Sequence, residues 1–101
     1  MPFRLSKAAE LDLLNIWRYT CQKWSESQAD KYLDELDAVC SQIGGEELPV
    51  KHMPEVHPAL RHRHHGRHYV FWLANSEPPI VIAFLHDRME LVKHLSERIS
   101  E

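Results

Sequence analysis

The sequence predicts an α+β domain with the element order β-α-α-β-β-β and a short C-terminal helix. Two observations lead to this prediction. The first half of the chain contains two amphipathic helical patterns, and three segments of β character follow between residues 60 and 85. We expect the helices to form an antiparallel hairpin on a small, mostly antiparallel sheet. A chain of 101 residues is the size of one domain, so we expect residues 1–101 to share one core.

The helical half begins with a short alternating segment at residues 3–6, where Ser6 can cap a helix over 7–24. Ser25 followed by Gln28 is a capping box that opens a second helix, which Gly44 and Gly45 would end. Each helix carries one apolar stripe, which should face the sheet. The first stripe comprises Ala9, Leu13, Ile16, Trp17, Thr20 and Trp24, and the second comprises Ala29, Tyr32, Leu33, Leu36, Val39, Cys40 and Ile43.

The second half begins with a connector over 46–58, in which three prolines disfavour regular structure. Residues 60–65 are polar and basic, as expected of an edge strand, and Gly66 marks a turn. Residues 67–74 and 80–85 are apolar on both alternating faces, so both faces of these strands should be covered. A helix over 89–99 would cover part of the second face, and any apolar remainder would be a docking surface. Strict alternation would place Ile80, Ile82 and Phe84 opposite Val81, Ala83 and Leu85.

Charge is distributed unevenly along the chain, whose net charge is −3. Residues 1–50 carry five Lys and Arg against nine Asp and Glu, whereas residues 51–101 carry seven against six and all eight histidines. The overall acidity argues against a general nucleic-acid binder, and the asymmetry favours a partner surface on the strand side. The sequence contains neither a secretory signal nor an apolar run of membrane-spanning length, so we expect a cytoplasmic protein with buried, unpaired Cys21 and Cys40.

The most unusual chemistry lies in the basic segment from Arg61 to His68. Alternation places Arg61, Arg63 and His65 on one face of the predicted strand and His62 and His64 on the other. Two histidines at this spacing are only half of a metal site, so we expect no metal and no cofactor. The guanidinium groups suit contact with phosphate or with an acidic partner, and a solvated edge strand is the simpler interpretation.

A second polar segment, His86-Asp87-Arg88, follows the last apolar strand. In a ribonuclease, His86 would act as general acid and base, and Arg61, Arg63 and Arg88 would stabilise the charged phosphorane. The simpler interpretation is that His86 fixes the turn between strand and helix through a hydrogen bond. The aromatic residues Trp17 and Trp72 are expected in the core, and Trp24 less strongly so.

The order of motifs between residues 60 and 95 resembles the ParE branch of the RelE/ParE toxin superfamily. With the helical half, the resemblance covers nearly the whole chain. The resemblance rests on three runs: Gly66, His68, Val70, Phe71 and Trp72; then Ile80, Ile82, Leu85 and His86; and finally Arg88, Met89 and Glu90, followed by His94 and Leu95.

This resemblance implies the toxin of a type II toxin–antitoxin pair, a protein that inhibits DNA gyrase by contact and forms a hetero-oligomer with its antitoxin. No direct binding to nucleic acid and no membrane association are implied. A ribosome-dependent mRNA endonuclease of the RelE type is the alternative, and a degenerate toxin that binds only its antitoxin is a third. Residues 86–101 depart from the endonuclease pattern, because they contain no tyrosine and Lys93 is their only lysine.

The residues expected to serve each partner follow from this resemblance. The expected gyrase contacts are Arg61, Arg63, Arg67, His86, Arg88 and Met89. The antitoxin is expected on the helical hairpin and on the exposed strand edge, at Trp17, Tyr32, Arg63 and His65.

Overall fold

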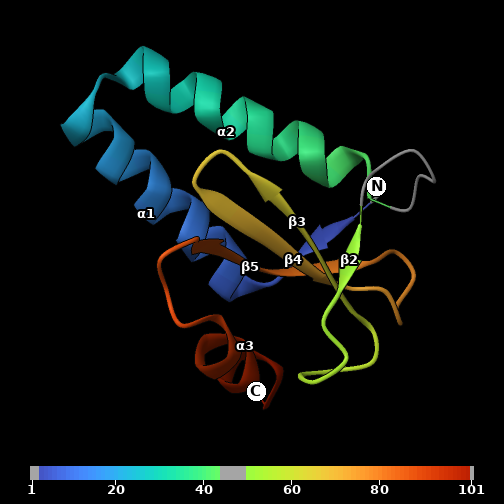
Figure 1. Cartoon of the computed structure of the whole chain (residues 1–101). Helices are drawn as coiled ribbons and strands as arrows, with labels where there is room; N and C mark the ends of the chain where they lie inside the picture. Colours follow the sequence, from blue (N-terminus) through green and yellow to red (C-terminus); the bar gives the residue numbers. More distant parts are fainter. Residues whose placement is uncertain (1–2, 44–49, 101) are drawn as a thin grey trace.

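The computed structural model describes residues 3–43 and 50–100 and has the predicted α+β architecture, with a helical hairpin on one face of a mixed sheet (Figure 1). A third helix lies against the other face. None of these helices combines the length and the apolar character that crossing a bilayer requires. The elements are β1 (Arg4–Leu5), α1 (Lys7–Lys23), α2 (Glu26–Ser41), β2 (Lys51–His52), β3 (Leu60–His65), β4 (His68–Leu73), β5 (Ile80–His86) and α3 (Leu91–Ser100).

The helices begin where the sequence predicts. The hydroxyl of Ser6 accepts a hydrogen bond from the N–H of Ala9 at 3.1 Å, and that of Ser25 accepts one from Gln28 at 3.1 Å. Each cap satisfies a backbone donor that the first turn of a helix leaves free. The predicted stop at residues 44–45 lies outside the described residues.

The sheet has the strand order β1-β5-β4-β3-β2, in which β1 runs parallel to β5 and the other pairs are antiparallel. The prediction that β3 is an edge strand is therefore wrong, because Lys51 of β2 pairs with His62 of β3. Prolines interrupt the connector at positions 49, 54 and 58, but positions 50–53 keep their backbone donors. That short interval is sufficient for a two-residue strand.

The hairpin covers one face of the sheet and forms the larger core. Ile16 and Leu36 bury their side chains against Val70, Trp72 and Phe84 of the sheet. The stripe prediction is thus confirmed for most positions, but it is wrong for Trp24, which is 73% exposed. Trp17 is only partly buried, and its indole N–H donates to Asp30 Oδ1 at 2.9 Å.

The second face of the sheet is covered by α3 and by the connector. Leu95 of α3 and Leu60 of β3 are fully buried there, and Met53 and Val56 of the connector pack against the same cluster. Within residues 3–43 and 50–100, this face therefore retains no large apolar remainder for a partner. Large apolar side chains are exposed instead on α1, at the hairpin tip, and just before and within the first turn of α3, namely Leu11, Leu14, Tyr19, Trp24, Met89 and Val92.

The predicted alternation along β5 is wrong in its second half. Phe71 of β4 pairs with Ala83, but the next residue, Trp72, pairs with Val81, so Ile82 is an extra residue in the ladder. Such a β-bulge reverses the alternation beyond it. Phe84 consequently joins Val81 on the hairpin face, while Ile82 and Ala83 both belong to the core beneath α3.

Both cysteines are free thiols. Cys40 is buried as expected, and burial raises the pKa of its thiol to about 12. Cys21 is only partly buried, so the expectation of burial is wrong for this residue. It stands near the end of α1, close to the hairpin tip, where the helices have less of the sheet beneath them (Figure 1).

Candidate partner-binding cleft

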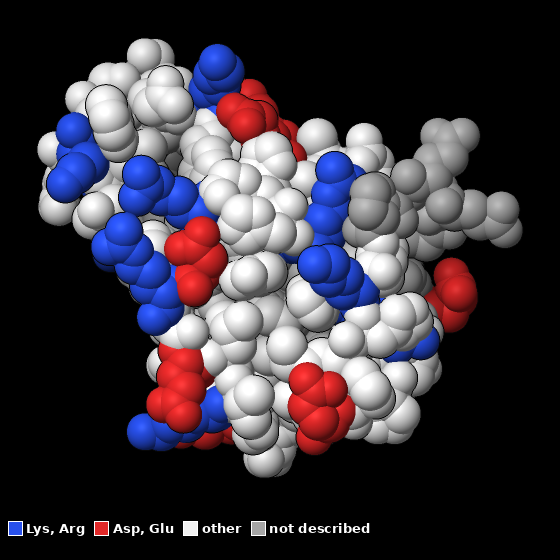
Figure 2. All heavy atoms as spheres, in the orientation of Figure 1, with Lys and Arg blue, Asp and Glu red and all other residues white. Residues whose placement is uncertain are grey.

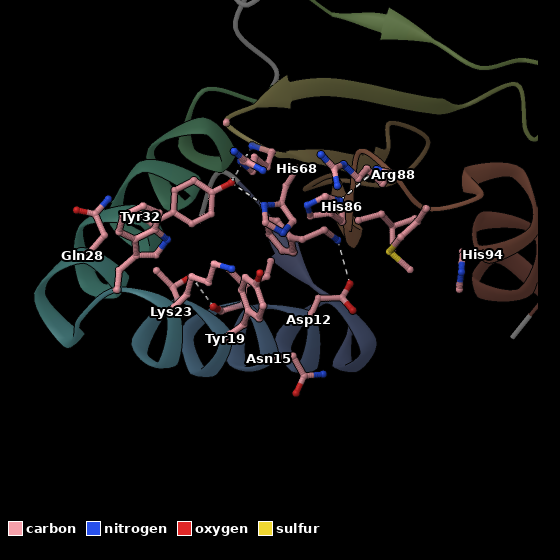
Figure 3. A pocket seen from close by; sticks show the side chains of 18 of the residues that line it. Asp12, Asn15, Tyr19, Lys23, Gln28, Tyr32, His68, His86, Arg88 and His94 are labelled. Atoms are coloured by element: carbon pink, nitrogen blue, oxygen red, sulfur yellow. Dashed lines mark hydrogen bonds between the residues drawn. The ribbon is translucent and has the colours of Figure 1, made fainter.

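An open cleft of about 980 Å³ lies between the hairpin tip and the edge where the sheet leads into α3 (Figure 3). Its walls come from α1, the start of α2, the β3–β4 turn, the end of β5 and α3. The volume is near the upper end of the roughly 300–1,000 Å³ typical of binding pockets. The cleft therefore has room for several side chains of a partner.

The β3–β4 turn is held against α2 by Tyr32. Its hydroxyl oxygen lies 2.6 Å from Nδ1 of His68, donates to the carbonyl of His65 at 3.3 Å, and accepts from the N–H of Arg67 at 3.4 Å. Gly66 has φ = +59°, and a Cβ at this position would lie 2.8 Å from the Tyr32 hydroxyl oxygen. Both the backbone conformation and the close approach thus require glycine.

Two histidines meet at the floor of the cleft, with the ring centroids of His68 and His86 5.4 Å apart. Burial, and then the charge of His86, lower the pKa of His68 to about 4, so His68 is neutral at neutral pH. Nδ1 of His86 accepts a hydrogen bond from the N–H of Arg88 at 3.2 Å, which fixes the strand exit. The hydrogen bond from His64, at 3.2 Å, lowers the pKa of the neighbouring Asp87.

Asp12 and Arg98 tie three elements together at the β5 edge. The carboxylate of Asp12 accepts from the N–H of Phe84 at 2.9 Å and pairs with both terminal nitrogens of Arg98, at 2.8 and 2.9 Å. Arg98 also donates to the carbonyl of Ile82 at 2.7 Å. Because both side chains are largely buried, this bidentate pair fixes α3 to α1 and to the sheet.

The cleft rim carries cations on three sides: Lys23 from α1, Arg67 from the β3–β4 turn and Arg88 from the loop after β5. None of the three forms a salt bridge within residues 3–43 and 50–100. Figure 2 shows Lys and Arg side chains gathered on the left of the molecule, where Figure 1 places these same segments. Beside them, Tyr19 and Trp24 are 61% and 73% exposed.

The cleft brings together some of the residues expected from the sequence. Arg67, His86, Arg88 and Met89 line it, as does Tyr32. His65 adjoins Tyr32, with ring centroids 6.1 Å apart, and its Nε2 lies 2.9 Å from Glu35 Oε1.

The other expected residues lie elsewhere. Arg61 donates to the carbonyl of Pro58 at 2.9 Å, and Arg63 donates to Gln42 Oε1 at 3.3 Å, so neither reaches the cleft. Trp17 faces Asp30 of α2 and does not line the cleft either.

Sequence reasoning missed several residues of the cleft. Tyr19 and Lys23 lie off the predicted apolar stripe, and Trp24 was assigned to it, yet all three line the cleft near the hairpin tip. The sequence signal that indicates these cleft residues is the presence of large aromatic residues beside a helix–helix junction. The pair of Asp12 and Arg98 is separated by 86 residues in the sequence, so no local pattern could have indicated it.

The part of the chain that the structure describes contains no group of three or more His, Cys, Asp or Glu side chains placed to hold a metal ion. His62, a buried histidine of β3, packs against Tyr69 and Phe71 on the opposite face of the sheet. Burial lowers its pKa, which is consistent with a neutral ring inside an apolar cluster.

A helical hairpin on a small mixed sheet, with an open cleft that combines unpaired cations and exposed aromatic rings, defines a small domain suited to binding a partner molecule. A family model described as the ParE toxin of the type II toxin–antitoxin system parDE matches residues 3–91. The chain is 40% identical to Toxin ParE of Escherichia coli over 96 residues, which is 94% of this chain and 93% of that protein.

Two further relatives have similar coverage. Toxin ParE1 of Caulobacter vibrioides is 35% identical over 93% of this chain and 97% of its own length. Toxin ParE1 of Mycobacterium tuberculosis is 31% identical over 92% of this chain and 96% of its own length. The chain belongs to the ParE toxin family of type II toxin–antitoxin systems.

Proposed function

We propose that this toxin inhibits DNA gyrase by protein–protein contact, without catalysing a reaction, and acts in the cytoplasm. A cognate antitoxin would neutralise it in a hetero-oligomeric complex. Membership of the ParE toxin family supports the toxin–antitoxin context. The structural observation that carries the proposal is that Arg67, His86, Arg88 and Met89, all expected to contact the target, share one open cleft.

The proposal assigns the remaining expected residues to neighbouring surfaces. Arg61 and Arg63 lie on β3, outside the cleft, and would extend the gyrase contact along that strand. For the antitoxin we propose the hairpin, at Trp17 and Tyr32, together with Arg63 and His65 of β3. An acidic antitoxin segment beside these cations would associate faster at low ionic strength.

A ribonuclease of the RelE type is the second candidate, because His86 and Arg88 line the cleft beside His68. That reaction would also use Arg61 and Arg63 to stabilise the phosphorane, but the side chains of both form hydrogen bonds outside the cleft. Nδ1 of His86 is already used by the backbone of Arg88, which leaves only Nε2 for proton transfer. The contact mechanism is therefore the better supported of the two.

A paired assay tests the proposal. Purified protein is added to a gyrase supercoiling reaction with relaxed plasmid, and separately to a translating ribosome with a defined message. We expect loss of supercoiling and an intact message. Arg88→Ala should weaken inhibition, whereas Arg18→Ala, which changes an exposed cation of α1 outside the cleft lining, should not. Message cleavage with unaltered supercoiling would refute the proposal. Unaltered supercoiling together with an intact message would indicate a toxin that binds only its antitoxin.

A further inference from the structure

We infer that the cleft receives an acidic, amphipathic helical segment of the gyrase protein, bound through side chains. This inference rests on the proposed function and adds the chemistry of the segment and the way it docks. We place this contact in the cleft because four residues expected to contact gyrase, Arg67, His86, Arg88 and Met89, line it.

The positive charge of the cleft rim favours an anionic partner. Lys23, Arg67 and Arg88 stand on three sides of the cleft, and none of them forms a salt bridge within the described ranges, while the charge of Arg67 contributes to lowering the pKa of the neighbouring Asp87. The one carboxylate in the lining, that of Asp12, is engaged by Arg98. An incoming acidic side chain would therefore meet unpaired cations instead of displacing existing salt bridges.

The lining beneath this rim favours a protein over a nucleic acid. Ile16, Phe84, Leu85 and Met89 contribute apolar side chains to the cleft, which suit the apolar face of a helix. The whole chain carries a net charge of −3, which opposes the approach of a polyanion, and the three cations of the cleft rim are few to offset that repulsion.

The β5 edge favours a helix over an added strand. Strand addition requires free N–H and C=O groups on the receiving edge. The N–H of Phe84 is bound by Asp12 and the carbonyl of Ile82 is bound by Arg98, so these two side chains block that edge at the cleft. A helix needs no backbone groups from the receiving edge, because its own backbone hydrogen bonds are internal and its side chains make the contacts.

The exposed rings of Tyr19 and Trp24 supply the apolar anchors for such a helix. Both are large and rigid, and both border the cations instead of the core. Aromatic residues of this kind lose little conformational entropy on binding and are enriched among residues that dominate binding energy. The cleft thus has Tyr19, Trp24 and Lys23 at the hairpin tip and Arg67 and Arg88 at the sheet end. Figure 3 shows Tyr19 and Lys23 on α1 and Arg88 across the cleft from them.

Site-specific photo-crosslinking with purified gyrase identifies the occupant directly. A photoreactive amino acid replaces Trp24 in the cleft or, as a matched control, Leu11, an exposed apolar residue on the same helix and outside the cleft. Without DNA, we expect the probe at position 24 to link to an acidic helical segment of a gyrase subunit and the probe at position 11 to link to none. Crosslinks at position 24 only to DNA, or equal crosslinking from both positions, would overturn the inference.

Charge reversal provides the second test. The double variant Arg67→Glu and Arg88→Glu should raise the protein concentration needed for half-inhibition of supercoiling about tenfold or more, since it replaces two attractive contacts by two repulsive ones and a close interfacial charge pair contributes on the order of that factor. The control Lys7→Glu and Arg18→Glu, which changes net charge equally on exposed positions outside the cleft, should shift it less than about twofold. Equal thermal melting of the two variants confirms that both are folded.

The outcomes separate this inference from the proposed function. If the unsubstituted protein fails to inhibit gyrase, both fall. If it inhibits gyrase and the cleft variant inhibits equally well, gyrase remains the target but the cleft is not its docking site. If the cleft variant keeps inhibition and loses only neutralisation by the antitoxin, the cleft belongs to the antitoxin and the inference is overturned.

Discussion

The part of the helical hairpin above the sheet and the part at its tip both carry large apolar side chains, but these side chains lie in different environments. Over the sheet, Ile16 is 8% exposed and Leu36 is fully buried, whereas beyond the sheet Trp24, which belongs to the same predicted stripe as Ile16, is 73% exposed. Figure 1 shows the hairpin tip extending past the strands. An apolar stripe therefore forms core only as far as a sheet lies beneath it, and past that point it becomes surface available to a partner.

The largest expected effect comes from the half of the hairpin above the sheet. Leu36→Ala removes a fully buried side chain and should lower the free energy of unfolding by about 2–5 kcal/mol, because the cavity left behind closes only partly. Trp24→Ala, at the tip, should change it by less than about 0.5 kcal/mol. Urea denaturation of both variants measures the difference. Similar losses would show that the tip is part of the core after all.

The next effect concerns the ion pair that ties both regions to α3. Asp12→Asn should destabilise the protein by about 2–4 kcal/mol, because it removes the carboxylate charge that pairs with the largely buried guanidinium of Arg98. Glu10→Gln, an exposed acid on the same helix, is the matched control and should have little effect. Denaturation at neutral pH measures both. An Asp12→Asn variant as stable as the unsubstituted protein would mean that the pair does not hold α3 in place.

A smaller effect is expected at the turn that lies against Tyr32. Gly66→Ala should cost about 1–2 kcal/mol, since alanine disfavours a positive φ and its Cβ would press on the tyrosine ring. Gly66→Asn should recover part of that loss, because asparagine tolerates this conformation better, although its Cβ meets the same contact. Thermal melting of the two variants measures both terms. No loss in Gly66→Ala would show that Tyr32 can move aside.

The last expected effect, which is absent at neutral pH and appears only in acid, is a pH dependence at the cleft floor. In the unfolded chain a histidine takes up a proton near pH 6.5, whereas His68 in the fold remains neutral down to about pH 4. Between about pH 6.5 and about pH 4, the unfolded state therefore binds one proton more than the folded state. The free energy of unfolding should consequently fall as the pH drops through this range. His68→Gln should show a shallower fall in urea denaturation across that range. Identical slopes would exclude His68 as the source.

Local sequence patterns predict most of the fold. Ser6 and Ser25 begin helices where capping chemistry predicts, and Gly66 forms the predicted turn. These predictions succeed because caps, turns and periodicity depend on residues within a few positions of each other. The strand β2 and the bulge at Ile82 were not predicted, since both depend on which neighbour a strand finds.

The sequence by itself determined the fold class, the starts of the two hairpin helices and most of the buried positions on their stripes, because local hydrogen bonds and apolar spacing suffice for these. Only the tertiary structure decided that Trp24 stays exposed, that Asp12 meets Arg98, and that Arg67 and Arg88 share a cleft from which Arg61 and Arg63 are excluded. The physical reason is that the end of the sheet, and not any local pattern, sets where burial stops. A cleft is built from side chains that are distant in sequence, and its shape follows from packing among whole elements.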